Sequence, residues 1–90
     1  MGYEYRLDFE VPDRADADRV LRNVPGFEGF NPKFELYSFR RQSTDAMPDA
    51  DAKIEQSGIY LCDYGTGYQV VRDIQAAFSA IGLHAELREL

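Results

Sequence analysis

The amino-acid sequence predicts an α+β domain in which two helices lie on one face of a four-stranded antiparallel sheet. Residues 3–11 alternate between apolar and charged side chains, which is typical of a strand with one face in water. Residues 58–62 form a short apolar run, and residues 70–81 carry apolar side chains at helical spacing. With a second helix and two further strands, the expected order is strand–helix–strand–strand–helix–strand.

The first strand and the helix after it have clear boundaries. The apolar side chains of the strand share one face: Tyr3, Tyr5, Leu7, Phe9 and Val11. Pro12 ends the strand, and Asp13 is a good helix N-cap because its carboxylate can accept a hydrogen bond from a free backbone N–H. Apolar residues then recur at helical spacing up to Val24, and Pro25 and Gly26 end the helix after about three turns.

The middle of the chain gives weaker signals. Residues 26–33 are interpreted as a loop because of their glycine, asparagine and proline content, with Phe27 and Phe30 folded back onto the core. Residues 34–41 are predicted to form the second strand. Whichever face of this strand is buried, large apolar side chains remain on the face that points away from the core. Residues 42–52 are polar and acidic and contain a proline, so we expect a long, mobile hairpin loop there.

The best-defined stretch runs from the third strand into the second helix. Residues 58–62 are mostly β-branched, aromatic or aliphatic, as expected of a central strand. Thr66 precedes Gln69 by three positions, which is the spacing of a capping box at a helix N-terminus. Apolar residues continue at helical spacing to Ile81, and Gly82 follows at the position where a left-handed cap favours glycine.

Residues 83–88 alternate between apolar and polar side chains and predict the last strand. Because strand–helix–strand connections are right-handed, both helices should lie on the same side of the sheet. This layout resembles the ferredoxin-like arrangement, with the expected strand order 4-1-3-2. We expect residues 1–90 to form a single domain of this kind. Because that arrangement supports many unrelated functions, it does not indicate one here.

Charge and composition argue against several classes of function. Sixteen acidic residues against ten basic ones give a formal net charge of −6. Proteins that track phosphates need a surplus of Lys and Arg, so we expect neither nucleic-acid binding nor docking on an anionic membrane. The single cysteine excludes an internal disulfide, and no apolar run approaches the roughly 20 residues of a membrane span. No secretory signal pattern is present, so the expected location is the cytoplasm.

The sheet face opposite the helices is the first candidate for a functional surface. The first and last strands present charged side chains on it, whereas the two strands in the middle of the chain leave large apolar side chains there: Tyr37 and Phe39, or their alternates on the other parity, together with Tyr60 and Cys62. Apolar patches on small proteins tend to mark contact surfaces. The leading hypothesis is therefore a small acidic protein-interaction module that pairs through this face, most simply as a homodimer, or with another protein. In the competing interpretation, a loop of the same chain covers the patch.

Two further hypotheses stay open. Gly65, Thr66 and Gly67 lie between a strand and a helix N-terminus, where a small ligand or anion could bind, so an anion-sensing regulatory domain is the alternative. A small dimeric enzyme with a cleft near His84 is the third hypothesis, although no nucleophile is adjacent to this histidine in sequence. No residue is assigned a catalytic, cofactor-binding or metal-binding role, and we expect no cofactor.

Overall fold

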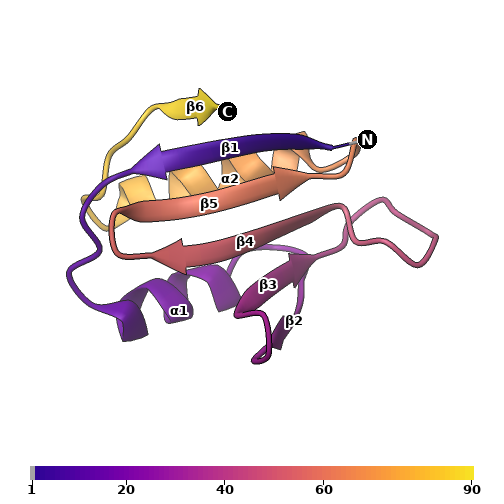
Figure 1. Cartoon of the computed structure of the whole chain (residues 1–90), viewed down its shortest axis with the longest axis horizontal. Helices are drawn as coiled ribbons and strands as arrows, with labels where there is room; N and C mark the ends of the chain where they lie inside the picture. The colour runs from indigo at the N-terminus through magenta and orange to yellow at the C-terminus, as the bar shows by residue number, and fades with distance from the viewer. Residues whose placement is uncertain (1) are drawn as a thin grey trace.

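Six strands form one antiparallel sheet in the computed structural model, which describes residues 2–90 (Figure 1). Along the chain the elements are β1 (Tyr3–Asp8), α1 (Arg14–Arg22), β2 (Phe27–Asn31), β3 (Leu36–Phe39), β4 (Ala50–Glu55), β5 (Gly58–Asp63), α2 (Tyr68–Ala80) and β6 (Leu87–Glu89). The order across the sheet is β2-β3-β4-β5-β1-β6. Both helices lie on one face, and their apolar side chains share a single core with the sheet.

The predicted four-stranded ferredoxin-like sheet with order 4-1-3-2 is wrong, because the sheet has six strands. The additional strands, β2 and β4, come largely from two stretches that were expected to be loops. In β2, a register shift between Phe27 and Gly29 lets a glycine-containing segment pair with β3. In β4, Ala50, Ala52 and Ile54 are buried and alternate with charged residues. The segment was not predicted as a strand because its first residues belong to an acidic stretch that was expected to be a loop.

The orientation of β3 is settled by burial, which places its largest side chains beneath the helices. Tyr37 is 4% exposed and Phe39 is 0% exposed. Tyr37 pairs with Ala52, and Ala52 pairs with Leu61 of β5, so the three side chains form a row on the covered face. The expectation that Tyr37 and Phe39 lie on the open face is therefore wrong. The smaller Leu36 faces the open side instead, because burying two aromatic rings removes more apolar surface from water.

An aromatic cluster attaches the β2–β3 hairpin to α1. The ring centroids of Phe27 and Phe30 lie 6.3 and 4.6 Å from that of Tyr37. The guanidinium of Arg22 on α1 lies over all three rings, 5.6 to 5.9 Å from their centroids. Arg22 also pairs with Asp18, which accepts a hydrogen bond from the Tyr37 hydroxyl. The two phenylalanines thus pack against the core as expected, but from a strand and not from a loop.

The helix boundaries were predicted with mixed success. Asp13 caps α1 as expected, since its carboxylate accepts the backbone N–H of Ala15 at 2.9 Å. The capping box predicted for α2 does not form, because the Thr66 hydroxyl donates to Asp49 and the Gln69 amide donates to Asp73. Asp73 lies one helical turn after Gln69, but the sequence did not reveal that Asp49 would lie beside the start of the helix.

The last strand is shorter than predicted. β6 pairs with β1 only from Leu7–Leu87 to Tyr5–Glu89, so residues 83–86 are not part of the sheet. This segment carries the chain from the end of α2 back to the edge of the sheet (Figure 1). The side-chain amide of Gln75 on α2 holds the segment by donating to the carbonyl oxygen of Ala85 at 2.9 Å.

Candidate functional site

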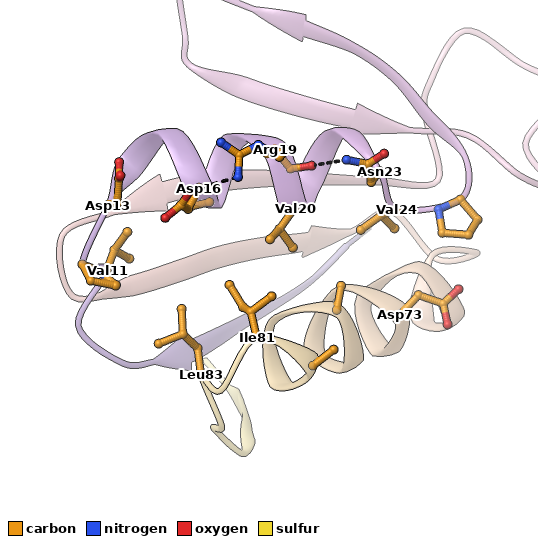
Figure 2. Close-up of a pocket in the computed structure, with 15 residues that line it drawn as sticks. Val11, Asp13, Asp16, Arg19, Val20, Asn23, Val24, Asp73, Ile81 and Leu83 are labelled. Carbon is orange, nitrogen blue, oxygen red and sulfur yellow. Dashed lines mark hydrogen bonds and ion pairs between the residues drawn. The ribbon is translucent and has the colours of Figure 1, made fainter.

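A groove lies between α1 and α2 and has a cavity volume of about 670 Å3 (Figure 2). Its lining comes from the β1–α1 connection, α1 and the turn after it, α2, and the segment after α2: Val11, Pro12, Asp13, Asp16, Ala17, Arg19, Val20, Asn23, Val24, Pro25, Asp73, Ala77, Ala80, Ile81 and Leu83. No motif or charge pattern in the sequence analysis pointed to this groove.

The walls of the groove are apolar because the apolar stripes of the two helices are wider than the sheet can cover. Figure 2 shows Val20 and Ile81 pointing into the space between the helices from opposite sides. Ile81 remains 51% exposed, although it is a large aliphatic side chain. Ala77 and Ala80 lie on the α2 side, where their short side chains leave the space unfilled. The groove is therefore apolar surface that this chain leaves in contact with water.

The rim of the groove is acidic. Three aspartates, Asp13, Asp16 and Asp73, line it together with one arginine, Arg19, which leaves a formal charge of −2. Arg19 pairs with Asp16 at 3.0 Å, and both side chains are at least half exposed. Asp73 pairs with Arg41, which lies outside the lining. Asp13 forms no ion pair with any residue from 2 to 90.

The open face of the sheet is different, because its polar side chains satisfy one another. Arg6 donates to Asp8 and Glu55, and Asp8 in turn accepts hydrogen bonds from Arg88. Arg88 and Arg6 hold the pKa of the Asp8 carboxyl below its ordinary value, against the opposing effect of desolvation. These contacts cross strands β1, β4 and β6, so the face is a network of charged groups and not an apolar patch.

Of the four residues expected to form an interface, only Tyr60 and Cys62 lie on the open face, and both are half-buried. The Tyr60 hydroxyl donates to Glu4. Burial raises the pKa of the Cys62 thiol above its ordinary value, with the carboxylates of Asp51 and Glu4 adding to the shift. Cys62 therefore stays a thiol at neutral pH, which does not favour a nucleophilic role.

Beside Cys62, one carboxylate connects β3, β4 and the residue that follows β5. Asp51 of β4 is 8% exposed and accepts hydrogen bonds from the Ser38 hydroxyl at 2.9 Å and the Tyr64 hydroxyl at 2.6 Å. Burial raises the pKa of Tyr64, and the hydrogen bond to Asp51 raises it further. Both donors keep their protons at neutral pH, so neither hydroxyl is a nucleophile, and the two hydrogen bonds to Asp51 stabilise the sheet.

The turn formed by Gly65, Thr66 and Gly67 carries its own carboxylate. The backbone N–H groups of Gly65 and Gly67 donate to Asp63 Oδ1 at 2.8 and 2.7 Å. The Thr66 hydroxyl donates to Asp49. An external anion at this turn would have to displace Asp63, so the geometry gives the anion-sensing hypothesis little support.

Asp49 is a buried carboxylate that organises the loop expected to be mobile. It is 0% exposed and accepts hydrogen bonds from the backbone N–H groups of Arg41, Gln42 and Ser43 as well as from Thr66. Burial alone raises the pKa of Asp49, but these hydrogen bonds outweigh it and hold the pKa well below the ordinary value. The loop after β3 is thus tied to the start of α2.

The guanidinium of Arg40 holds the tip of the same loop. It donates to the carbonyl oxygens of Asp45 at 2.6 Å and Met47 at 3.1 Å.

Within residues 2–90, no group of three or more His, Cys, Asp or Glu side chains is arranged to hold a metal ion. Asp45, Asp49 and Asp51 instead accept hydrogen bonds from groups of the protein: Asp45 from Ser43 and Met47, Asp49 from the backbone N–H groups of residues 41–43 and from Thr66, and Asp51 from Ser38 and Tyr64.

His84 has a partner that the sequence analysis missed. Ser79, in the last turn of α2, lies with its Oγ 2.6 Å from His84 Nδ1. They line a shallow depression of about 580 Å3 together with Arg72, Gln75 and Glu86, among others. In the part of the chain that the structure describes, the imidazole hydrogen-bonds to Ser79 and to no carboxylate, so no acidic group orients it as a general base. The turn at Gly82 brings the two together, which helical spacing alone does not reveal.

The comparisons with known proteins give no functional information. No family model matches the chain, and neither the curated proteins nor the solved structures include a significant match. None of the helices in residues 2–90 is long and apolar enough to cross a membrane.

Proposed function

We propose that this protein is a small acidic interaction module that binds another protein through the groove between α1 and α2. The observation that carries the proposal is a concave site with apolar walls in which the large aliphatic side chain of Ile81 is 51% exposed. Apolar surface in a concavity with a polar rim is the usual form of a protein contact site. The proposal keeps the class of function expected from the sequence and moves the contact to the opposite side of the sheet.

Homodimerisation through the open face has less support. Tyr37 and Phe39 are inside the core, so the pairing surface would consist of Tyr60 and Cys62 among charged neighbours. The Tyr60 hydroxyl is already bonded to Glu4, and Arg6 and Asp8 are already paired. Burying such a network against a second copy would require desolvating charges that water and their partners now satisfy.

The test compares two surface variants in the cells that naturally produce the protein. The tagged full chain, an Ile81→Asp variant and a Tyr60→Lys variant are used to recover associated proteins, and each recovered pair is rebuilt from purified components. Recovery that survives Tyr60→Lys and is lost with Ile81→Asp supports the groove. Recovery with the opposite pattern, or a dimer that only Tyr60→Lys dissociates in light scattering, overturns the proposal in favour of the open face.

A further inference from the structure

The groove has the features of a site for one particular kind of partner, and this inference rests on the proposed function. We infer that the groove binds a cationic amphipathic helix of another protein, with the apolar side of that helix between α1 and α2 and its Lys or Arg side chains on the rim. The apolar walls, the backbone groups near the groove and the rim charges each contribute to this inference.

The walls favour a helical occupant over an extended one. An extended peptide needs backbone donors and acceptors from its partner, as at the free edge of a sheet. The groove is bounded by two helices, α1 and α2, whereas the sheet edges are β2 and β6. A helix satisfies its own backbone and presents apolar side chains three and four positions apart, which suits a groove between Val20 and Ile81.

The rim favours a cationic occupant. Asp13 and Asp16 lie toward one end of the groove and Asp73 toward the other (Figure 2). The Asp13 carboxylate is available for a further partner, because its only hydrogen bond within residues 2–90 is the N-cap contact to the backbone N–H of Ala15. A basic side chain of an incoming helix would meet the Asp13 carboxylate at one end of the groove. Further basic side chains would join the ion pairs that Asp16 forms with Arg19 and Asp73 forms with Arg41. The net charge of −6 on the whole chain also attracts such a helix over longer distances.

The same charges disfavour a second copy of this chain as the occupant. A pair of copies facing each other through the groove would bring two acidic rims together, each with a formal charge of −2. Like charges placed opposite each other across an interface suppress binding. A basic partner removes this repulsion, so we assign the groove to a different protein.

The test titrates the labelled full-length chain with a designed peptide of leucine and lysine, about 14 residues or four helical turns long. Two matched peptides serve as controls. One replaces every lysine with glutamate, and the other keeps the composition but contains prolines that prevent helix formation. Binding is measured by fluorescence anisotropy, and its location is mapped by amide chemical shifts. We expect the lysine helix to bind at least about tenfold more tightly than both controls, with the largest shifts at Val20, Ile81 and Leu83.

Variants of the protein separate the contributions of charge and shape. Asp13→Asn with Asp16→Asn keeps a good N-cap and should weaken the lysine peptide about twofold to tenfold. Glu86→Gln removes a charge from the other flank of α2 and should change the affinity by less than about twofold. Ile81→Asp should weaken binding at least about tenfold while the thermal transition stays near that of the parent.

Each remaining outcome has a defined meaning. If the glutamate helix binds the groove as tightly as the lysine helix, the cationic partner is overturned and the interaction function stands. If the proline peptide binds equally well, the helical occupant is overturned. A groove that closes on a second copy, so that Ile81→Asp converts a dimer to a monomer, overturns the assignment to a different protein. If the amide chemical shifts change across the acidic surface but not in the groove, the inference is overturned. The proposed function is decided separately, by recovery of a native partner.

Discussion

The two faces of the sheet differ in how fully the chain satisfies them. On the open face, Arg6, Asp8 and Arg88 pair across strands, and Tyr60 donates its hydroxyl proton to Glu4. On the helical side, apolar side chains continue past the buried core into a groove where Ile81 is half exposed. The polar groups on the face without helices are therefore paired with each other, whereas the side with the helices still exposes apolar side chains to water.

This difference shows that a sheet face is not necessarily a contact surface because no helix covers it. A bare sheet face is stable in water if its polar groups are paired with each other or with solvent. A helix pair that covers a sheet still leaves a contact site if its apolar stripes extend beyond the core. The relevant question is which groups lack a partner in the folded chain. The predictions below test the contrast between the two faces, from the largest expected effect to the smallest.

Replacing a core aromatic should be far more damaging than changing its neighbour on the open side. Phe39→Ala should lower the free energy of unfolding by about 3–5 kcal/mol, because Phe39 is 0% exposed and its loss leaves a cavity. Ser38→Ala, one position earlier on the opposite face, should cost less than about 1.5 kcal/mol through its hydrogen bond to Asp51. Urea unfolding at neutral pH measures both values. Similar losses for the two variants would contradict the orientation of β3.

The buried Asp49 should contribute stability that depends on pH. Asp49→Asn should cost about 2–4 kcal/mol at pH 7, because the charged acceptor of three backbone N–H groups and the Thr66 hydroxyl is lost. The pKa of Asp49 is lowered in the folded state, so its contribution is complete above the unfolded pKa of about 3.9 and decreases as pH falls below it.

Unfolding of the parent chain and of Asp49→Asn at pH 7 and pH 3 tests the sign of this effect. The difference between the two proteins should shrink by about 1 kcal/mol at pH 3. A difference that grows on acidification would show that the carboxyl is protonated in the native protein.

On the open face, the charged network should be worth more than an isolated surface pair. Arg6→Gln should lower the free energy of unfolding by about 1–2 kcal/mol, because the Arg6 side chain is 17% exposed and bonds to Asp8, Glu55 and Ser57. Arg14→Gln is the matched control, since the Arg14–Glu35 pair is more than half exposed and should contribute less than about 0.5 kcal/mol. Equal effects in thermal unfolding would mean that the open face is not a connected network.

Polar substitution in the groove should hardly change stability. Ile81→Ser is expected to alter the free energy of unfolding by less than about 0.5 kcal/mol, because half of the side chain is already in water. Ile74→Ser, which changes a buried residue within α2, should cost several times more. A large loss for Ile81→Ser would show that this residue belongs to the core, which would remove the motive for a partner.

Most periodic stretches of the sequence were read correctly, because their patterns are local. The alternation over residues 83–88 is the exception, since only Leu87–Glu89 forms a strand. Alternation predicted β1, the composition of residues 58–62 predicted β5, and helical spacing predicted both helices. Asp13 caps α1, and Gly82 adopts the expected positive φ after α2. In each case the signal lies within one or two turns of the residue concerned.

The errors lie where distant contacts decide the structure. The acidic segment at 50–55 becomes a strand because it pairs with β3 on one side and β5 on the other. Thr66 fits a capping box by spacing, but Asp49, seventeen positions earlier, takes its hydroxyl. Ser79 and His84 meet only because the chain turns at Gly82. Neither the periodicity of apolar residues nor secondary-structure propensity predicts these pairings.

The candidate site was missed for a related reason. The sequence shows that Val20 and Ile81 belong to apolar stripes, and such stripes are normally buried. Whether a given member is buried depends on how the two helices sit on the sheet. Only the packed structure shows that both residues face a shared groove.

Sequence alone determined the α+β composition, the two helices, the strands β1 and β5 and the acidic charge, because each depends on neighbours along the chain. The tertiary structure decided the number of strands, the inner face of β3 and the position of the exposed apolar surface. Those features depend on which segments compete for the same partners. Such competition is resolved by burial and hydrogen bonding across the whole fold, and these are not encoded in any local stretch of sequence.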